Sequence, residues 1–214
     1  MKWKEILISS IVVIILIGGY CTLFALILLF SNAPATLLAI ITILTLIFGS
    51  IGLIIVSGTR FIKTHPPIIA SEAKDVAISP LDCFTWGHLM FGVLSFSVDL
   101  LFIVGLSLNP GLLLWWSIIL TLILIGVSWD IIENTIFIEI DIKFENRRDS
   151  TINIFSDVFF VTIGGLLMLL IYLITDMRFF ITSIIAIVIL AICGVIFLIR
   201  YKMVVQKRKG VNDK

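Results

Sequence analysis

The sequence predicts an all-α, polytopic membrane protein built as a bundle of about six transmembrane helices. Hydrophobic residues make up 60% of its 214 residues and charged residues only 14%, whereas about 25% of the residues of a soluble domain are charged. Apolar runs long enough to cross a membrane recur along the chain, and basic residues gather in alternate connections. We therefore expect a single transmembrane domain over residues 1–214.

Six segments contain the roughly 20 apolar residues that a helix needs to cross the hydrocarbon core. The first has no A-x-A-like cleavage site, so we expect a true span rather than a signal peptide. Short turn-forming sequences, such as TDMR at 175–178, separate several of the segments. The six expected spans are residues 6–30, 36–57, 83–106, 112–138, 151–174 and 179–201.

With six spans, the two sides of the membrane receive very unequal numbers of basic residues. Arg178 falls on one side, and the other 14 of the 15 Lys and Arg residues fall on the opposite side. By the positive-inside rule, both termini and the two long connections, 58–80 and 139–150, lie in the cytoplasm of a plasma-membrane protein. This sorting leaves no basic face for nucleic acid, so nucleic-acid binding is excluded.

Ionisable residues occur near the cytoplasmic ends of the third, fourth and fifth predicted spans. His88 belongs to the third span, Asp130 and Glu133 to the fourth, and Asp157 to the fifth. A charged side chain at mid-bilayer costs roughly 2.5–3.5 kcal/mol, so such residues usually face a protein interior and mark function. At the rise of an α-helix, His88 and Asp157 lie about 10 Å from the ends of their spans. We therefore expect the three groups to converge at one depth.

Helical spacing gives each of these spans one polar face. Asp130, Glu133 and Asn134 stand at i, i+3 and i+4, and Asn153 and Asp157 at i and i+4, with Gly164 continuing the second stripe. A similar stripe on the third span consists of Phe84, His88, Gly92, Ser95 and Asp99. The small residues of this stripe suit close helix packing.

Three motifs in a fixed order carry a resemblance to a known family. They are GHLMFG at 87–92, WDIIENT at 129–135 and DSTINIFSD at 149–157. Over about residues 82–165 the chain resembles the prokaryotic membrane proteins grouped as the domain of unknown function 2585, and its motif order also resembles that of VanZ-like membrane proteins, associated with glycopeptide resistance. Phe91 stands where the first family often has a second His, which weakens a metal-binding expectation. The positions that the resemblance implies as polar site residues are His88, Glu133, Asn134, Asp149, Ser150, Asn153 and Asp157.

One function that these residues predict is hydrolysis of a membrane lipid or its phosphorylated headgroup. Carboxylates and an imidazole can act as general acid and base, or can hold a divalent metal that activates water. The catalytic candidates are His88, Asp130, Glu133 and Asp157, and the metal-ligand candidates are His88, Glu133 and Asp157. The substrate-binding candidates are Asn134, Asp149, Ser150, Asn153, Arg147 and Arg148, whose two guanidinium groups could hold a lipid phosphate.

Two alternatives remain open at this point. In the first, the chain is an ion- or proton-coupled translocation protein or a lipid-binding protein, Asp99 extends the polar path outward, and a homo-oligomer completes the pathway. In the second, the polar residues only clamp the helices together, at about 0.6 kcal/mol for each interhelical contact, and Ser150 is the N-cap of the fifth helix. Membrane lipids are the expected partners in the first alternative and in the hydrolase hypothesis.

Overall fold

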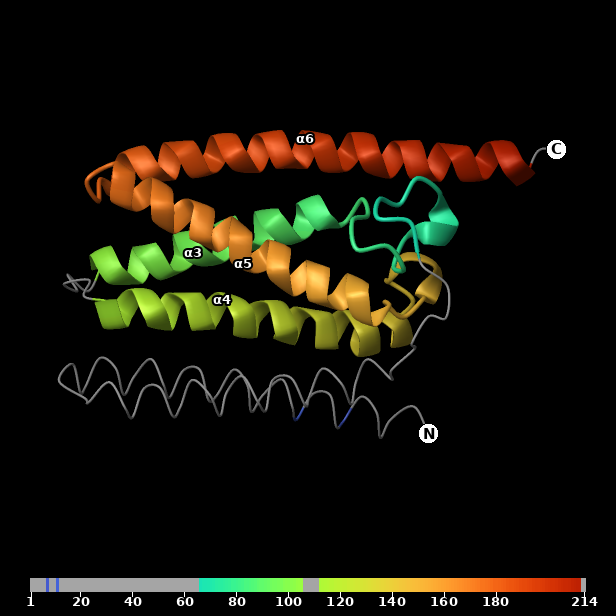
Figure 1. Ribbon diagram of the computed structural model, residues 1–214, viewed down its shortest axis with the longest axis horizontal. Coiled ribbons are helices and arrows are strands. Elements are labelled where there is room, and N and C mark those ends of the chain that lie inside the picture. Colours follow the sequence, from blue (N-terminus) through green and yellow to red (C-terminus); the bar gives the residue numbers. More distant parts are fainter. Residues whose placement is uncertain (1–6, 8–10, 12–65, 106–111, 213–214) are drawn as a thin grey trace. The chain divides into compact units, whose positions relative to one another are not determined.

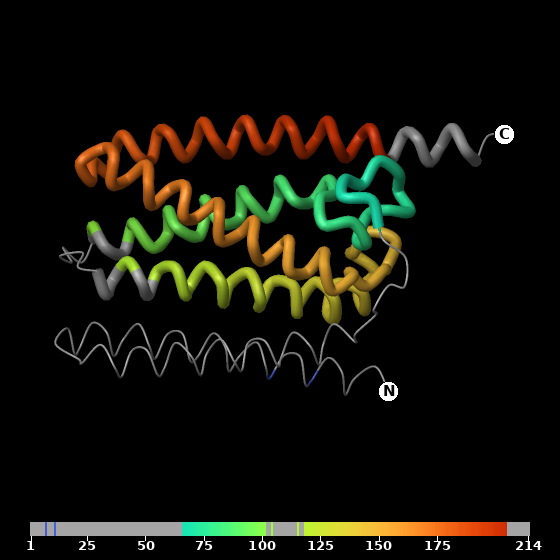
Figure 2. Tube along the Cα trace, in the orientation of Figure 1, coloured from blue at the N-terminus to red at the C-terminus, as the bar shows by residue number. Residues whose placement is uncertain are grey.

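The computed structural model describes residues 66–105 and 112–212, together with Leu7 and Ile11 (Figure 1). Figure 2 traces the Cα atoms in the same orientation. Apart from those two residues, the predicted spans 6–30 and 36–57 lie outside the described part of the chain. Among the described residues all the secondary-structure elements are helices, apart from one isolated β-bridge that joins Ile69 to Leu81. The predicted all-α fold class is confirmed for this part.

Within the described residues, three helical stretches are long and apolar enough to cross a membrane, and they indicate a membrane protein. They are Ile118–Phe137, Thr151–Ile174 and Phe179–Val204. The chain divides into two compact units, which we describe separately. The first unit comprises Met1–Arg60 and Pro110–Arg148, and the second comprises Phe61–Asn109 and Asp149–Lys214.

The second unit is built from helices α3 (Thr85–Gly105), α5 (Thr151–Ile174) and α6 (Phe179–Asn212) (Figure 1). Helix α3 packs against both α5 and α6, and α5 runs obliquely across α3. The apolar core includes Phe96 of α3 and Met168 of α5, both fully buried. Helix α6 continues to Asn212 and is therefore longer than the predicted span 179–201.

The crossing of α3 and α5 depends on two glycines. A Cβ atom on Gly92 would lie 1.9 Å from the carbonyl oxygen of Val161, and one on Gly164 would lie 2.2 Å from that of Leu89. No larger residue fits at either position without moving backbone, so the two helices touch there main chain to main chain. The predicted role of the small residues of the third span in close helix packing is confirmed at Gly92.

A tight turn joins α5 to α6 where the sequence TDMR predicts one. Asp176 and Met177 adopt left-handed backbone conformations, and the Met177 N–H donates to the carbonyl of Tyr172 at 2.9 Å. This bond satisfies one of the last carbonyls of α5, which have no partner within the helix. The turn lets α6 run back beside α5 and α3.

Residues 66–84, the segment that precedes α3, fold against the helices of the second unit. The N–H of Ala70 donates to Leu81 O at 2.7 Å, and the N–H of Leu81 donates to Ile68 O at 3.0 Å. Between these two legs lies the short 3-10 helix η1 (Ala73–Asp75). Arg200 of α6 donates from Nη2 to Ala70 O at 3.1 Å, which ties the loop to α6.

The first unit contains α4 (Leu112–Ile132), which continues directly into the π-helical segment η2 (Glu133–Phe137). A second short 3-10 helix, η3 (Phe144–Asn146), follows in the connection toward α5. The sequence predicts a continuous helix over 112–138, and helical backbone does extend through that range. The change to π geometry at Glu133 is a departure from the regular α spacing on which the predicted polar face depends.

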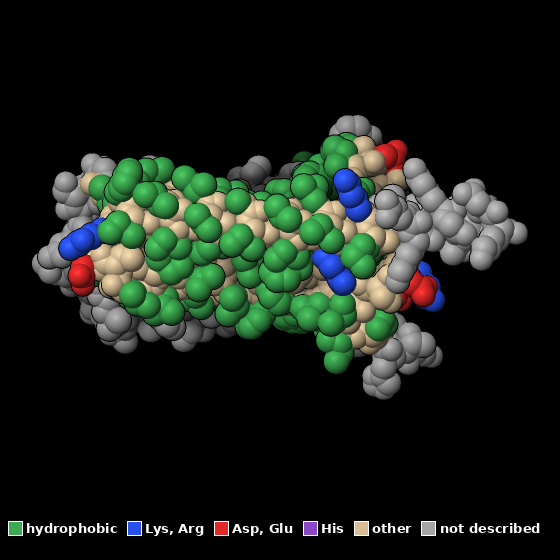
Figure 3. All heavy atoms as spheres, turned by 90° about the horizontal axis from the view of Figure 1, so that it is seen from above, with side chains coloured by type: hydrophobic (Ala, Val, Ile, Leu, Met, Phe, Trp, Pro, Cys, Tyr) green, Lys and Arg blue, Asp and Glu red, His purple; other side chains and the backbone are tan. Residues whose placement is uncertain are grey.

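The exposed surface of α6 is apolar over most of its length. Hydrophobic side chains cover this face, and Lys and Arg side chains lie toward its ends (Figure 3). Exposed members include Ile187, Val195 and Ile199. A surface of this kind fits acyl chains rather than water.

Candidate functional site

His88 and Asp157 meet in the second unit, at the end of the α3–α5 interface where both helices begin. The imidazole Nε2 of His88 lies 3.5 Å from Oδ2 of Asp157. His88 is 5% exposed and Asp157 3% exposed, although His88 is in the first turn of α3 and Asp157 in the second turn of α5. The sequence prediction that these two residues come together is confirmed. Both belong to helices whose crossing at Gly92 and Gly164 fixes their separation.

The loop before α3 covers this end of the helices through a ladder of hydrogen bonds to α5. Four successive carbonyls, those of residues 77–80, each accept one bond from the first two turns of α5 or its cap. Ala77 O accepts from Ser150 N at 2.7 Å, and Ile78 O accepts from Ser150 Oγ at 2.8 Å. Ser79 O accepts from Asn153 Nδ2 at 2.8 Å, and Pro80 O accepts from Ser156 Oγ. We call these contacts the carbonyl ladder.

The carbonyl ladder gives two of the substrate-binding candidates a partner inside the protein. Asn153 and Ser150 are both buried and hold loop carbonyls. Ser150 also accepts from the N–H of Asn153 at 3.2 Å, so its expected role as the N-cap of the fifth predicted helix is confirmed. Much of the DSTINIFSD motif thus holds the loop, a use that the sequence analysis did not foresee.

Asp82 caps the start of α3 from within the same loop. Its Oδ1 accepts the N–H groups of Phe84 at 2.7 Å and Thr85 at 3.2 Å, and Oδ2 accepts the N–H of Ala77 at 3.2 Å. The hydroxyl of Thr85 accepts the N–H of Asp82 at 3.0 Å in return, which makes a reciprocal capping arrangement. Asp82 was not among the predicted site residues, but an Asp three residues before a Thr at the start of an apolar run is a recognisable capping signal.

Burial raises the pKa of the Asp82 carboxyl above its ordinary value of 3.8, because the protein interior disfavours the charged form. Hydrogen bonds from the N–H groups of Ala77 and Phe84, and then the nearby His88, act in the opposite direction, while Asp149 raises the pKa further. Asp82 therefore interacts electrostatically with both His88 and Asp149. Asp149 is itself buried in the second unit.

In the first unit, a buried lysine reaches the polar residues of η2. The Nζ of Lys143 lies 3.2 Å from Oδ1 of Asn134 and 3.5 Å from Oε1 of Glu133, and the Lys143 side chain is only 3% exposed. Asn134 in turn donates from Nδ2 to the backbone carbonyl of Asp130 at 3.0 Å. Three of the predicted site residues are thus gathered at one turn, with an ammonium group beside them.

Lys143 is the residue that the sequence analysis missed in this unit. It was counted only as one of the basic residues that fix topology. The chain reverses direction after Phe137, whose carbonyl accepts the N–H groups of Ile142 and Lys143 at 3.0 and 3.2 Å, and this reversal returns Lys143 to the end of its own helix. No periodic pattern in the sequence signals such a return.

The two arginines proposed as a phosphate clamp differ in their surroundings. Arg147 forms an ion pair with Glu145 within the same connection, which offsets the charge available to a phosphate. Arg148 is exposed. The role proposed for the pair stays a prediction, as does the meeting of His88 with Asp130 and Glu133, which belong to the other unit.

Comparisons with known proteins give no match: no family model, no curated protein and no solved structure is significantly similar to this chain. The resemblance to the domain of unknown function 2585 and to VanZ-like proteins therefore stays a prediction.

Proposed function

We propose that this protein is a hydrolase of a membrane lipid or of its phosphorylated headgroup, with His88 and Asp157 as its acid/base pair. The observation that carries the proposal is the buried contact between the His88 imidazole and the Asp157 carboxylate at the ends of α3 and α5. Buried ionisable pairs in membrane segments are costly and usually functional. An imidazole paired with a carboxylate can take up and release a proton in the exchange with water or substrate.

The same two side chains also fit a divalent metal. Two donors bound at about 2.0–2.1 Å to one tetrahedral metal lie about 3.4 Å apart, and Nε2 of His88 is 3.5 Å from Oδ2 of Asp157. Such an ion would activate water or stabilise a developing negative charge. We retain Glu133 as the proposed third ligand and Asp130 as a further acid/base candidate, on the sequence argument alone.

The packing of α3 against α5 favours a closed site over a channel along this interface. Beyond His88 and Asp157 the helices touch through Gly92 and Gly164, where not even a methyl group fits. Past that point the interface holds apolar side chains such as Phe96 and Met168. A polar path toward the far side of the membrane would need another route.

One observation supports the translocation alternative. Asp99 of α3 has a buried Oδ2 that makes no hydrogen bond to any described residue. It lies 11 residues beyond His88, or about 16 Å along the helix. A carboxyl group there could take up and release protons at a second position, separate from the His88–Asp157 pair.

For topology we propose the arrangement that the basic residues predict. The chain would cross the plasma membrane six times with both termini in the cytoplasm, because 14 of its 15 basic residues fall on one side of such an arrangement. His88 and Asp157 would then lie at the cytoplasmic side, within reach of cytoplasmic water and lipid headgroups.

The proposal is tested with purified protein in vesicles made from a mixed phospholipid extract. Products are followed by mass spectrometry for the wild type, His88→Gln and Asp157→Asn, with Ser97→Ala as a control because the Ser97 hydroxyl donates to its own helix at Val93 O. We expect lipid hydrolysis that falls about 100-fold or more in the first two variants, as for a lost general acid or base, and is unchanged in the control.

Two further measurements distinguish metal-assisted hydrolysis from proton translocation. Stoichiometric metal in the wild type that is lost in both Asp157→Asn and Glu133→Gln, measured by elemental mass spectrometry, supports the metal version. Proton uptake by the same vesicles that depends on Asp99 supports translocation instead. Hydrolysis that persists in His88→Gln, or no hydrolysis in any lipid, contradicts the acid/base assignment.

A further inference from the structure

The depth of the loop before α3 can be read from its attachment to α6. Arg200 lies one residue before the end of the predicted span 179–201, so its Cα lies just inside the expected membrane boundary of α6. Helical side chains lean toward the N-terminus of their helix, so Arg200 reaches inward rather than outward. Its Nη2 donates to Ala70 O at 3.1 Å, and Ala70 therefore lies level with the end of that span.

Just inside Arg200 the surface of α6 is apolar, whereas the exposed Lys202 lies just beyond it. Leu198 and Ile199, the two residues before Arg200, are both exposed large hydrophobic side chains. Phe155, which lies among the α5 residues that make the carbonyl ladder, is also exposed. The protein surface around the loop therefore presents large apolar side chains at the level of the end of the span.

The backbone of the loop meets the requirement that a bilayer imposes on irregular structure. Non-helical backbone is tolerated at membrane depth where its N–H and C=O groups are bonded within the protein. In the carbonyl ladder, the carbonyls of residues 77–80 each accept a hydrogen bond from Ser150, Asn153 or Ser156. Ala70 is bonded through both its N–H and its C=O, to Leu81 and Arg200.

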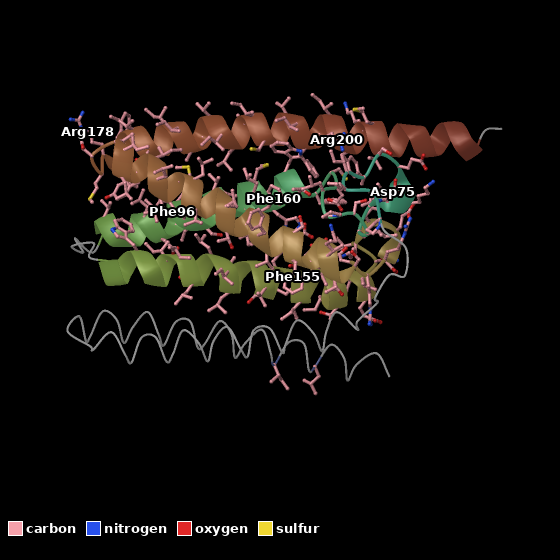
Figure 4. The ribbon with its side chains drawn as sticks, viewed as in Figure 1. Asp75, Phe96, Phe155, Phe160, Arg178 and Arg200 are labelled. Atoms are coloured by element: carbon pink, nitrogen blue, oxygen red, sulfur yellow. The ribbon has the colours of Figure 1, made fainter. Side chains whose placement is uncertain are left out.

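One part of the loop exposes apolar side chains and another part exposes charged ones. Ile68 is 71% exposed and Ile69 53% exposed, while Ala70 is fully buried. The tip carries an exposed ion pair between Lys74 and Glu72, at 2.8 Å. Asp75, at the end of η1, lies farther than Arg200 toward the C-terminal end of α6 (Figure 4).

We propose that residues 68–70 and 76–84 are two legs of a membrane-embedded loop, with Ile68 and Ile69 against the acyl chains of the leaflet and the η1 tip in water. The bilayer is the partner of this surface. The inference does not depend on the proposed hydrolase activity, because it rests on the depth of Arg200, the bonded backbone and the exposed isoleucines.

The test places an environment-sensitive nitrobenzoxadiazole dye on single cysteines at two positions of the same loop. Ile68→Cys and Lys74→Cys are made in a background carrying Cys21→Ser, Cys83→Ala and Cys193→Ala, and are reconstituted in vesicles. Both side chains are exposed, so neither substitution removes a packed group. We expect a blue-shifted dye at position 68 that is quenched by lipids brominated near the headgroup end of the acyl chain, and a dye at position 74 that is quenched by iodide in water.

Two results would overturn the inference. Equal iodide quenching at both positions would place the whole loop in water, and a dye at position 68 that neither quencher reaches would indicate a protein partner. If the cysteine-substituted background does not fold, Ile68→Asp and Lys74→Asp in the native chain replace it. Ile68→Asp must then lower the unfolding temperature in vesicles much more than Lys74→Asp, and equal effects would also overturn the inference.

Discussion

The interface of α3 and α5 has two regions that differ in how the helices make contact. In its middle, Gly92 and Gly164 bring the two backbones into direct contact with no side chain between them. At its end, His88 and Asp157 face each other and the carbonyl ladder binds a loop across the helices. Helix α5 runs obliquely across α3 (Figure 1). Because the two axes are closest at the glycines, they are farther apart at His88 and Asp157. The glycine contact therefore sets the space in which the polar residues sit.

The largest expected effect comes from closing the glycine contact with a side chain. Gly92→Leu should destabilise the protein by about 3 kcal/mol or more, because its Cβ would meet the Val161 carbonyl and neither backbone can move freely. Gly87→Ala is the matched control on the same helix, since nothing lies within 4 Å of its added Cβ. The control should gain up to about 1 kcal/mol in helix propensity.

Thermal unfolding in detergent, together with the position of each variant on size-exclusion chromatography, gives the measurement. Loss of stability in Gly87→Ala equal to that in Gly92→Leu would show that the contact at Gly92 has no special role. A stable Gly92→Leu protein would mean that α3 and α5 can separate without cost.

A smaller effect is expected when one rung of the carbonyl ladder is removed. Asn153→Ala leaves the buried Ser79 carbonyl without its donor, which should cost about 1–3 kcal/mol. Thr162→Ala, farther along α5, is the control, because the Thr162 hydroxyl donates to Val158 O of its own helix. The rate of backbone hydrogen exchange in residues 76–81 should rise in Asn153→Ala and stay unchanged in Thr162→Ala. An equal rise in both variants would show that the Asn153 hydrogen bond does not hold the loop.

The smallest expected effect is a pH dependence from Asp82. Its pKa in the folded protein is raised above 3.8 by burial, so the folded state binds more protons than the unfolded state between 3.8 and the raised value. Stability from this group is therefore fully present below 3.8 and is lost as the pH rises through the folded pKa. Asp82→Asn does not titrate, so the stability of the wild type relative to this variant should fall with rising pH. Unfolding temperatures over a pH series measure that difference, and a constant difference would contradict the assignment.

Helical periodicity was sufficient to predict the α3–α5 interface. His88 and Gly92 on one helix, and Asp157 and Gly164 on the other, stand at spacings that place them on one face, and the structure brings those faces together. Such prediction works because both helices are regular from end to end. The position of a side chain on a regular helix depends on residue number alone.

The loop and the end of α4 were beyond that reasoning for two physical reasons. The carbonyl ladder joins residues that are 72 to 76 positions apart. Because every residue has a backbone carbonyl, the residue types do not indicate which carbonyls accept these bonds. At Glu133 the helix changes to π geometry, and Lys143 returns to it through an irregular turn. Neither event follows from a repeating pattern.

The carbonyl ladder also constrains the order in which the protein can be assembled. Ser150 follows its acceptor, Ile78, by 72 residues, and at about 5–20 residues per second a ribosome needs roughly 4 to 15 seconds to add them. During that interval the carbonyls of residues 77–80 lack their donors and are best served by water. The loop can therefore settle into its final position only after α5 has been synthesised and inserted, so the covering of the His88–Asp157 end is a late step in biogenesis.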